Sequence, residues 1–244
     1  MAALTDQVAL VTGSTSGIGR AIARRLADEG AHLVINSVRS VEEGEAFSAS
    51  LPSAIYVQGD VADPQAARSL VARATEAWDR LDIVVNNAGT TQRIPHSDLD
   101  AVDAELFRHT LDVNVVGPWN VTQAAAPHLQ DGDGGQVVNI SSLAGVRPTG
   151  SSIPYATSKA ALNHLTRLLA NVLGPQVRVN AIAPGLIATP WTEDWQDLHR
   201  AVEQRAPLQQ VGTPEQIAEV CFGLVTSSYV TGEVIVADGG IHLR

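Results

Sequence analysis

The chain has 244 residues, a formal net charge of −10 at neutral pH and a pI near 5.0. So acidic a chain repels nucleic acid and anionic membrane surfaces, which excludes both as partners and leaves a small-molecule substrate as the expectation. No export signal and no run of about eighteen apolar residues is present, which predicts a cytoplasmic protein. The single cysteine, Cys221, excludes an internal disulfide and is expected to be a small buried apolar residue.

Seven short apolar runs alternate with segments of helical periodicity along the chain. Most runs are continuously apolar, as expected for parallel strands that are buried on both faces and joined by crossover helices. They span residues 8–12, 32–36, 54–58, 81–86, 135–141, 177–183 and 233–237. The pattern predicts an α/β fold, a doubly wound parallel seven-stranded Rossmann-type sheet with helices on both faces, as a single domain over 1–244.

Several segments between these runs carry turn or helix-start signals. Asp63 followed by Pro64 has the pattern of an N-cap and a first helical residue. Thr213 and Gln216 stand in capping-box spacing around Pro214. The sequence DGDGG at 131–135 lacks the other ligands of a calcium loop and is predicted to be a turn before the fifth strand.

A glycine-rich turn, TGSTSGIG, follows the first run and leads into a helix. Gly13, Gly17 and Gly19 let the backbone turn tightly and approach a phosphate, which the positive end of the helix attracts. Taken alone, these glycines also fit an ordinary tight turn. Asp60, at the end of the third run, can accept a hydrogen bond from an adenine amine, and the fourth run ends in NNAG at 86–89. Three strand ends meet at one crevice, which favours a dinucleotide site.

The motifs of the whole chain resemble those of the classical short-chain dehydrogenase/reductases. TGSTSGIG at 12–19, NNAG at 86–89, YATSK at 155–159 and APG at 183–185 stand in that family's order and approximate spacing. The resemblance implies an NAD(P)-dependent oxidoreductase and a homotetramer, with subunit contacts through the helices around Asn114 and Tyr155 and the C-terminal strand region. The cofactor contacts that it implies are Gly13, Ser16, Gly17, Ile18, Gly19, Ser37, Arg39, Asp60, Val61, Asn87, Ala88, Gly89, Tyr155, Lys159, Pro184, Gly185, Ile187 and Thr189.

The end of the second run bears on the choice between NADP(H) and NAD(H). Ser37 stands where an acidic residue would bind the ribose 2′-hydroxyl of NAD, and Arg39 is close enough to meet a 2′-phosphate. NADP(H) is therefore favoured over NAD(H). NAD(H) stays open as an alternative, because Ser16 replaces a basic residue found in many NADP-dependent relatives and Arg39 also fits a solvated loop charge.

Tyr155 and Lys159 are four residues apart in a segment of helical periodicity, which places them on one helix face. A phenol has an ordinary pKa of about 10, and a nearby ammonium is expected to lower it. The pair predicts proton transfer at a carbonyl or alcohol oxygen, beside hydride transfer at a nicotinamide. Lys159 is the single lysine among sixteen basic residues, and a compact ammonium fits between a phenol and a ribose hydroxyl better than a guanidinium does.

Ser142 and Asn114 complete the catalytic residues that the resemblance implies. Ser142 precedes Tyr155 by thirteen residues, a spacing similar to the family's, and its hydroxyl would bind the substrate oxygen. Ser141 is chemically equivalent, so the spacing alone selects Ser142. Asn114 stands inside an apolar helix and also fits a satisfied polar group. In the family, an asparagine here disturbs the helix and supports a water relay to the lysine.

Residues 186–212 follow the APG motif and are predicted to form a substrate lid. Trp191 and Trp195 are four residues apart, a spacing that would place both on one side of a short helix. They either line an apolar pocket or pack the lid against the body or against another subunit.

The predicted substrate is a small, apolar ketone or secondary alcohol. Relatives that reduce 3-oxoacyl groups on an acidic carrier protein commonly have basic residues where this chain has 131–135 and 172–176. A 3-oxoacyl thioester of a carrier protein or CoA remains the alternative. A non-catalytic dinucleotide-sensing or scaffold protein is a second alternative, which the four catalytic residues disfavour. No metal is expected, because the seven histidines form neither an i, i+4 pair nor an HExxH motif.

Overall fold

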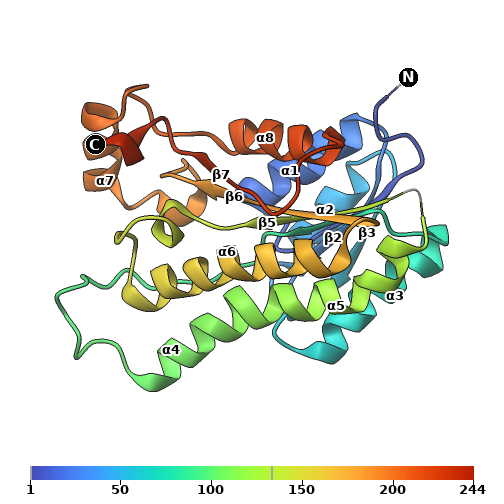
Figure 1. Ribbon diagram of the computed structural model, residues 1–244, viewed down its shortest axis with the longest axis horizontal. Helices are drawn as coiled ribbons and strands as arrows, with labels where there is room; N and C mark the ends of the chain where they lie inside the picture. Colours follow the sequence, from blue (N-terminus) through green and yellow to red (C-terminus); the bar gives the residue numbers. More distant parts are fainter. Residues whose placement is uncertain (1, 133) are drawn as a thin grey trace.

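The computed structural model describes residues 2–132 and 134–244, in which one seven-stranded parallel sheet carries helices on both faces (Figure 1). The strands are β1 (Val8–Val11), β2 (His32–Ser37), β3 (Ala54–Gln58), β4 (Ile83–Asn86), β5 (Gly135–Ile140), β6 (Val177–Pro184) and β7 (Val234–Ala237). Their order is β3-β2-β1-β4-β5-β6-β7, so the direction of winding reverses between β1 and β4. The predicted fold class is confirmed, and no predicted run differs from its strand by more than two residues at either end.

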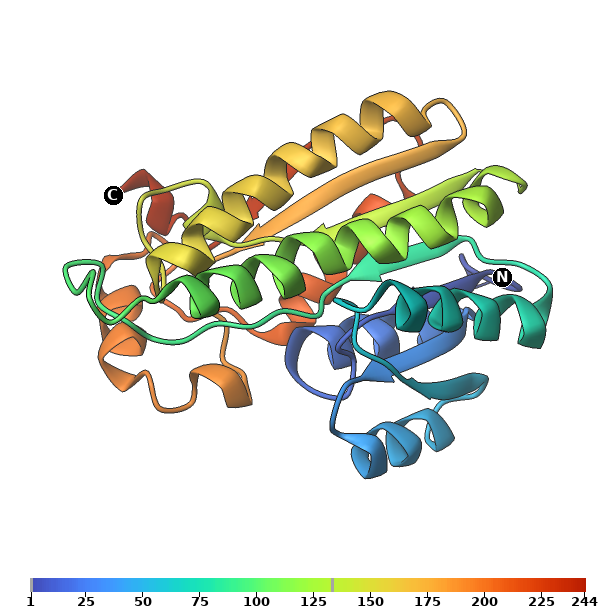
Figure 2. The same cartoon turned by 90° about the horizontal axis from the view of Figure 1, so that it is seen from below.

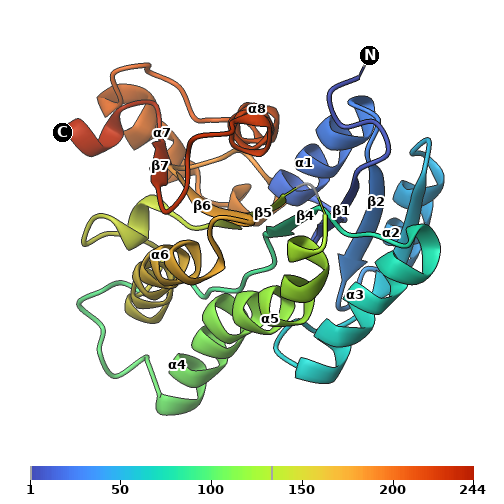
Figure 3. The same ribbon diagram turned by 45° about the vertical axis from the view of Figure 1, so that its right-hand side comes forward.

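The helices divide into two layers, one on each face of the sheet (Figure 3). They are α1 (Gly17–Asp28), α2 (Val41–Ala49), α3 (Pro64–Trp78), α4 (Ala104–Leu111), α5 (Gly117–Gln130), α6 (Ile153–Leu173), α7 (Gln196–Arg205) and α8 (Pro214–Thr226). One buried cluster joins α1 and α8 to β1 through Ala9 and Val11, while the other joins α3, α5 and α6 through Val8 and Leu10. The alternation follows from the two-residue period of a strand.

Both helix-start predictions are confirmed by hydrogen bonds. The Asp63 side chain accepts the Gln65 N–H at 2.8 Å ahead of α3, and Thr213 and Gln216 form the predicted capping box at the start of α8. Cys221 is fully buried, as predicted, and burial raises the pKa of its thiol to about 12. The predicted turn at 131–135 includes residue 133, which lies outside the described residues, and β5 begins at Gly135.

A π-helical segment, Asp112–Val116, connects α4 to α5, and the three together form one long rod that runs beside α6 (Figure 2). This arrangement brings Asn114 next to the helix that carries Tyr155 and Lys159. Within the described residues, no helix is both long and apolar enough to cross a membrane.

Candidate active site

The glycine-rich turn between β1 and α1 is held by side chains from the neighbouring strands. Thr12 Oγ1 accepts the backbone N–H groups of Asn87 and Ala88 at 3.0 Å each. The Asn87 side chain donates to the carbonyl oxygens of Thr12 and Gly13 at 3.0 and 2.8 Å. Asn36 of β2 accepts the Gly13 N–H at 3.3 Å and donates to the carbonyl groups of Val57 and Gly59. Four adjacent strand ends are thereby joined into one rigid edge.

The backbone of this turn fits a phosphate group, because side chains would not fit where its glycines stand. Gly13 has φ +59°, and a Cβ there would lie 2.9 Å from the Cα of Ala88. Gly17 has φ +51°, which strains any L side chain. Ser16 is the N-cap of α1 but its hydroxyl makes no capping bond, so the positive end of the helix is left for an anion. The turn can therefore hold the pyrophosphate of a dinucleotide.

A cavity of about 660 Å³ runs from the glycine-rich turn along the carboxyl ends of the strands to the lid. All the predicted cofactor-binding residues line it except Gly19, and Ser142, Tyr155 and Lys159 line it as well. A Cβ on Gly19 would lie 2.4 Å from Asn87 Nδ2, so this glycine allows close packing of α1 instead. Sequence reasoning missed other lining residues, among them Thr91, His109, Leu143, Ser151, Leu198 and Ile241, which stand outside the motifs.

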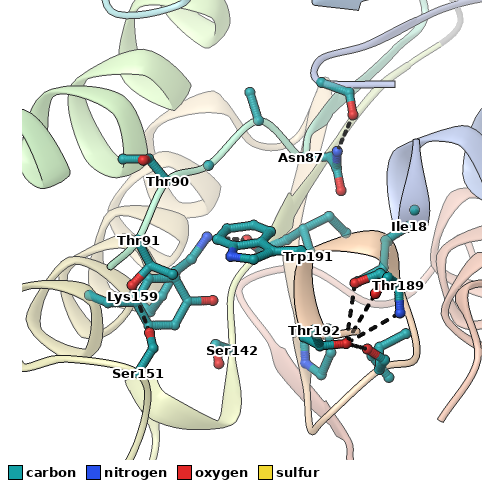
Figure 4. A pocket seen from close by; sticks show the side chains of 18 of the residues that line it. Ile18, Asn87, Thr90, Thr91, Ser142, Ser151, Lys159, Thr189, Trp191 and Thr192 are labelled. Carbon is teal, nitrogen blue, oxygen red and sulfur yellow. Dashed lines mark hydrogen bonds between the residues drawn. The ribbon is translucent and has the colours of Figure 1, made fainter. Parts of the chain in front are cut away.

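Tyr155 and Lys159 lie on the first turns of α6, as their spacing predicts. The Ser152 hydroxyl caps this helix by accepting the Tyr155 N–H at 3.4 Å. Lys159 is 4% exposed, and its Nζ donates to the Ile140 carbonyl at 2.8 Å and lies 5.6 Å from the centre of the Tyr155 ring. One helix therefore presents a phenol and an ammonium to the same part of the cavity, with Lys159, Ser142 and Thr189 around it in Figure 4.

Burial, rather than the neighbouring charge, sets the pKa of the phenol in this structure. Burial raises the pKa of Tyr155, and a hydrogen bond with Ser142 opposes part of that effect. The expected lowering by Lys159 is therefore wrong, because desolvation of the phenolate dominates. Burial also lowers the pKa of Lys159 to about 8. At neutral pH the tyrosine keeps its proton, and most of the lysine is charged.

The structure distinguishes the two adjacent serines after β5. Ser141 is 3% exposed and its hydroxyl donates to the backbone carbonyl of Lys159 at 3.3 Å. Ser142 stands at the start of the short helix Leu143–Gly145, accepts the Ala144 N–H at 3.1 Å and lies close enough to the Tyr155 phenol to lower its pKa in part. The hydroxyl next to the phenol is thus that of Ser142, the residue that the spacing selects.

Asn114 lies behind the cavity wall, in the π-helical segment. It is fully buried, and its side chain accepts the Thr90 N–H at 2.8 Å and donates to the Thr90 carbonyl at 3.0 Å and to Ser158 Oγ at 2.9 Å. A Cβ on Gly89 would lie 3.3 Å from Asn114 Oδ1 and 3.7 Å from Lys159 Nζ. The helix is disturbed where the family resemblance implied, and Asn114 connects α6 to the loop that follows β4.

The end of β2 carries no carboxylate toward the cavity. Ser37 is 8% exposed, and its hydroxyl is engaged with the Tyr56 hydroxyl at 2.9 Å and the Ser40 carbonyl at 3.2 Å. Arg39 is exposed and lines the cavity, as does Asp60, one oxygen of which accepts the Ala62 N–H at 2.9 Å. Near the end of β2 the cavity is therefore lined by an arginine and by a serine whose hydroxyl is already bonded within the protein.

The two lid tryptophans do not share a helix, so that expectation is wrong. Trp191 belongs to the short 3₁₀ helix Pro190–Thr192, whereas Trp195 is the N-cap residue of α7. Both line the cavity. The Trp191 ring lies edge-on to the Tyr155 ring, with 6.4 Å between centroids and 75° between planes. Trp195 lies beneath Arg93, whose guanidinium carbon is 5.8 Å from its ring centre.

Known proteins resemble this chain over nearly all of its length. A family model described as enoyl-(acyl carrier protein) reductase matches residues 13–242. The "Granaticin polyketide synthase putative ketoacyl reductase 2" of Streptomyces violaceoruber is 54% identical over 97% of this chain and 96% of its own. The 3-oxoacyl acyl-carrier-protein reductase FabG of Thermotoga maritima is 35% identical over 98% of each. A solved dehydrogenase/reductase from Sinorhizobium meliloti 1021 superposes with a TM-score of 0.91 at 33% identity, covering 98% of this chain and 96% of its own.

The fold, the dinucleotide turn and these likenesses define an NAD(P)-dependent oxidoreductase. The chain belongs to the short-chain dehydrogenase/reductase family. In residues 2–132 and 134–244, no group of three or more His, Cys, Asp or Glu side chains is placed to hold a metal ion.

Proposed function

We propose that the protein transfers a hydride between NADP(H) and the carbonyl carbon of a small, largely apolar ketone, or the reverse from the secondary alcohol. The observation that carries this proposal is the meeting of Tyr155, Ser142 and Lys159 at one end of the cavity that begins at the dinucleotide turn. When bound, the nicotinamide supplies or accepts the hydride. The chain's own residues bind the substrate oxygen and exchange its proton.

Tyr155 acts as the proton donor in the reducing direction. Because burial raises its pKa, the phenol is protonated at neutral pH and can donate to an oxygen on which negative charge develops. Ser142, whose hydroxyl lies beside that phenol, holds the same oxygen from a second side. The two hydroxyl groups fix the carbonyl of the substrate at the cavity end of α6.

Lys159 and Asn114 restore the proton and hold the geometry. The Lys159 ammonium is positioned by the Ile140 carbonyl, and it attracts negative charge at Tyr155 once the proton has left. Asn114 fixes the loop at Thr90 against α6, the helix that carries Lys159. We assign Asn114 a positioning role, since its side chain lies outside the cavity lining.

The test of this function is turnover of a ketone panel with NADPH, followed as loss of nicotinamide absorbance, with Tyr155→Phe as the catalytic variant. We expect at least about a hundredfold loss of kcat in that variant with little change in NADPH affinity, because only the proton donor is removed. Undiminished turnover by Tyr155→Phe would refute the mechanism. A native protein that binds NADPH but turns over no ketone would favour the dinucleotide-sensing alternative.

The preference for NADP(H) is supported by Arg39 at the cavity and by the uncharged Ser37. An arginine binds a 2′-phosphate through charge-assisted hydrogen bonds. We expect Arg39→Gln to raise KM for NADPH about tenfold and to leave KM for NADH unchanged, and Ser37→Asp to favour NADH. Equal KM values for NADPH and NADH in the native protein would contradict the assignment.

A 3-oxoacyl thioester is the second candidate substrate, and the relatives favour it. The printed names of two relatives specify a ketoacyl and a 3-oxoacyl acyl-carrier-protein reductase. Its reacting ketone would meet the same Tyr155 and Ser142. Turnover of a 3-oxoacyl thioester with and without a carrier protein distinguishes the candidates, and a large preference for the carrier-bound form would displace the free ketone.

We further propose a cytoplasmic homotetramer. Exposed apolar side chains on the rod of α5 and on α6 support a subunit contact there: Val116, Trp119, Leu168 and Val172 are 39, 42, 53 and 67% exposed. A solution mass equal to one subunit by light scattering would contradict it.

A further inference from the structure

The substrate end of the cavity offers mainly apolar surface, because hydroxyl groups near its wall already bond to the protein. Thr91 Oγ1 and Ser151 Oγ lie 2.7 Å apart and satisfy each other. Thr192 Oγ1 donates to the Ile187 carbonyl at 2.6 Å. Thr91 Oγ1 also donates to the Gln92 carbonyl at 3.2 Å, so the hydrogens of these hydroxyl groups are engaged and their oxygens are left only as acceptors. This disfavours a sugar-like substrate, whose many hydroxyl groups need donors as well as acceptors.

One of two indoles at this end is that of Trp191, which projects into the cavity in Figure 4. Trp191 is 47% exposed although its ring contacts that of Tyr155, so a large part of its surface is open to a ligand. Its edge-on contact with Tyr155 places this surface next to the proposed site of proton transfer.

The backbone under Trp191 is held by local hydrogen bonds, which position the indole at the cavity wall. Pro190 occupies the first turn of the short helix Pro190–Thr192. Thr189 and Thr192 form a capping box around that turn, with the Thr189 N–H donating to Thr192 Oγ1 at 3.3 Å. The His199 ring nitrogen Nε2 lies 3.0 Å from the Thr192 carbonyl and connects the turn to α7. A side chain on such a backbone loses little entropy on binding.

Further aliphatic and aromatic side chains of the wall come from the lid and from two other segments. Leu198 and Val202 of α7, Leu143 after β5 and Ile241 near the C-terminus line the same cavity. Trp195 is also there, and the guanidinium of Arg93 lies over its ring. Of these groups, Trp191 is the one whose ring contacts the ring of Tyr155. If the substrate carbonyl binds at Tyr155, an aromatic ring of the substrate next to that carbonyl would lie against Trp191.

We propose that Trp191 is a specificity-determining residue that selects ketones carrying an aromatic ring fused or attached close to the carbonyl. This proposal rests on the proposed ketone reduction at Tyr155. Aromatic rings attract one another in stacked or edge-on geometry beyond the effect of buried area, and a saturated ring of the same skeleton lacks this attraction. A flat aryl ketone can place its carbonyl at Tyr155 and its ring against the indole at the same time.

The experiment compares 2-tetralone with trans-2-decalone, which share one carbon skeleton and differ in a single aromatic ring. Neither carbonyl is conjugated, so their intrinsic reactivities are similar. We expect the native enzyme to prefer 2-tetralone by about tenfold in kcat/KM. We expect Trp191→Leu to reduce that ratio to about one. Trp191→Phe introduces a side chain of a volume similar to that of leucine but aromatic, and it should retain a ratio of about three or more. Thermal unfolding of each variant checks that the fold is intact.

Each other outcome has a defined meaning. An unchanged ratio in Trp191→Leu, or equal acceleration of both ketones, overturns the proposal, the latter because Trp191 would then be only a steric plug. The proposal for Trp191 is also overturned if the native enzyme reduces trans-2-decalone as well as 2-tetralone. It is likewise overturned if the enzyme reduces 3-oxoacyl thioesters but accepts neither ring ketone. In both cases the proposed ketone reduction itself stands. Failure of the native enzyme to reduce any ketone with NADPH refutes the proposed function itself.

Discussion

The glycine-rich turn and the lid border the same cavity, but they are held in place by very different contacts. Thr12 and Asn36, which fix the turn, are each 1% exposed and bond to neighbouring strand ends. In the lid, α7 contains no buried residue. Its side chains are joined to other segments by the exposed ion pair of Asp197 with Arg93 and by the contact of His199 with the turn that carries Trp191. We therefore propose that cofactor recognition belongs to the rigid half and substrate choice to the half with fewer constraints.

The largest effect that tests the rigid half is expected for Lys159→Arg. The lysine is almost fully buried and its Nζ is 2.8 Å from the Ile140 carbonyl, a space that suits a compact ammonium. We expect kcat to fall at least about a hundredfold although the charge is preserved. Arg167→Lys, an exposed exchange on the same helix, is the control and should keep native turnover. Near-normal activity of Lys159→Arg would show that any cation suffices.

A second test measures how tightly the turn is packed. Gly13→Ala places a Cβ 2.9 Å from the Ala88 Cα at a residue with φ +59°, which should lower the free energy of unfolding by about 2 kcal/mol. It should also weaken NADPH binding, because the turn must shift. Gly223→Ala is the matched control: no atom lies within 4 Å of its Cβ, so the helix α8 should gain up to about 1 kcal/mol. Urea unfolding measures both, and equal stability of the two variants would contradict this account.

The third test is the pH dependence of ketone reduction. Lys159 has a pKa lowered to about 8 by burial, so its charged form is lost as the pH rises through that value. Tyr155, whose pKa burial raises, keeps its proton over the same range. We expect kcat/KM for the ketone to be constant near neutrality and to fall about tenfold per pH unit above about 8. A profile that stays flat to pH 10 would mean that the lysine charge is not required.

Lys159 should also affect the stability of the protein. As the pH rises above about 8, its contribution to the free energy of unfolding should increase, whereas kcat/KM should fall. The folded pKa of Lys159 is about 8 and the reference value is 10.5, so between these values the unfolded chain binds more protons. This residue's contribution to stability therefore rises with pH over that window. Comparison with Lys159→Met isolates the contribution: the difference in Tm between native and variant protein should shift in favour of the native protein from pH 7 to pH 10.

The sequence predicts the rigid half better than the lid, and the reason is physical. Gly13, Gly17 and the Tyr155–Lys159 pair act through local backbone geometry, which spacing alone specifies. Ile241 and Ser151 reach the cavity through tertiary packing of loops, for which no motif exists. The spacing of the two lid tryptophans led to a wrong prediction of a shared helix. The short helix that begins at Pro190 ends at Thr192, before α7 begins.

The Tyr155 pKa shows a second limit of the same kind. The sequence shows that Lys159 is close, and this alone predicts a lowered value. Burial of the phenol arises from tertiary packing, of which the ring contact with Trp191 of the lid is one part. Its contribution is the larger one, so the direction of the shift reverses.

The smallest effect is expected at the lid contact itself, where Arg93 and Asp197 pair at 2.5 Å. The hydrogen bond from Arg93 lowers the pKa of Asp197, yet the two side chains are 43 and 58% exposed, so solvent screens the pair. Arg93→Ala should raise KM for the ketone about two- to threefold and leave kcat and Tm unchanged, and added salt should produce the same rise in the native enzyme. Arg73→Ala removes a similarly exposed pair, with Glu76 on α3, and should change neither constant. If Arg93→Ala lowers kcat as strongly as Tyr155→Phe does, the lid is part of the rigid catalytic framework, and the division between the two halves of the cavity is wrong.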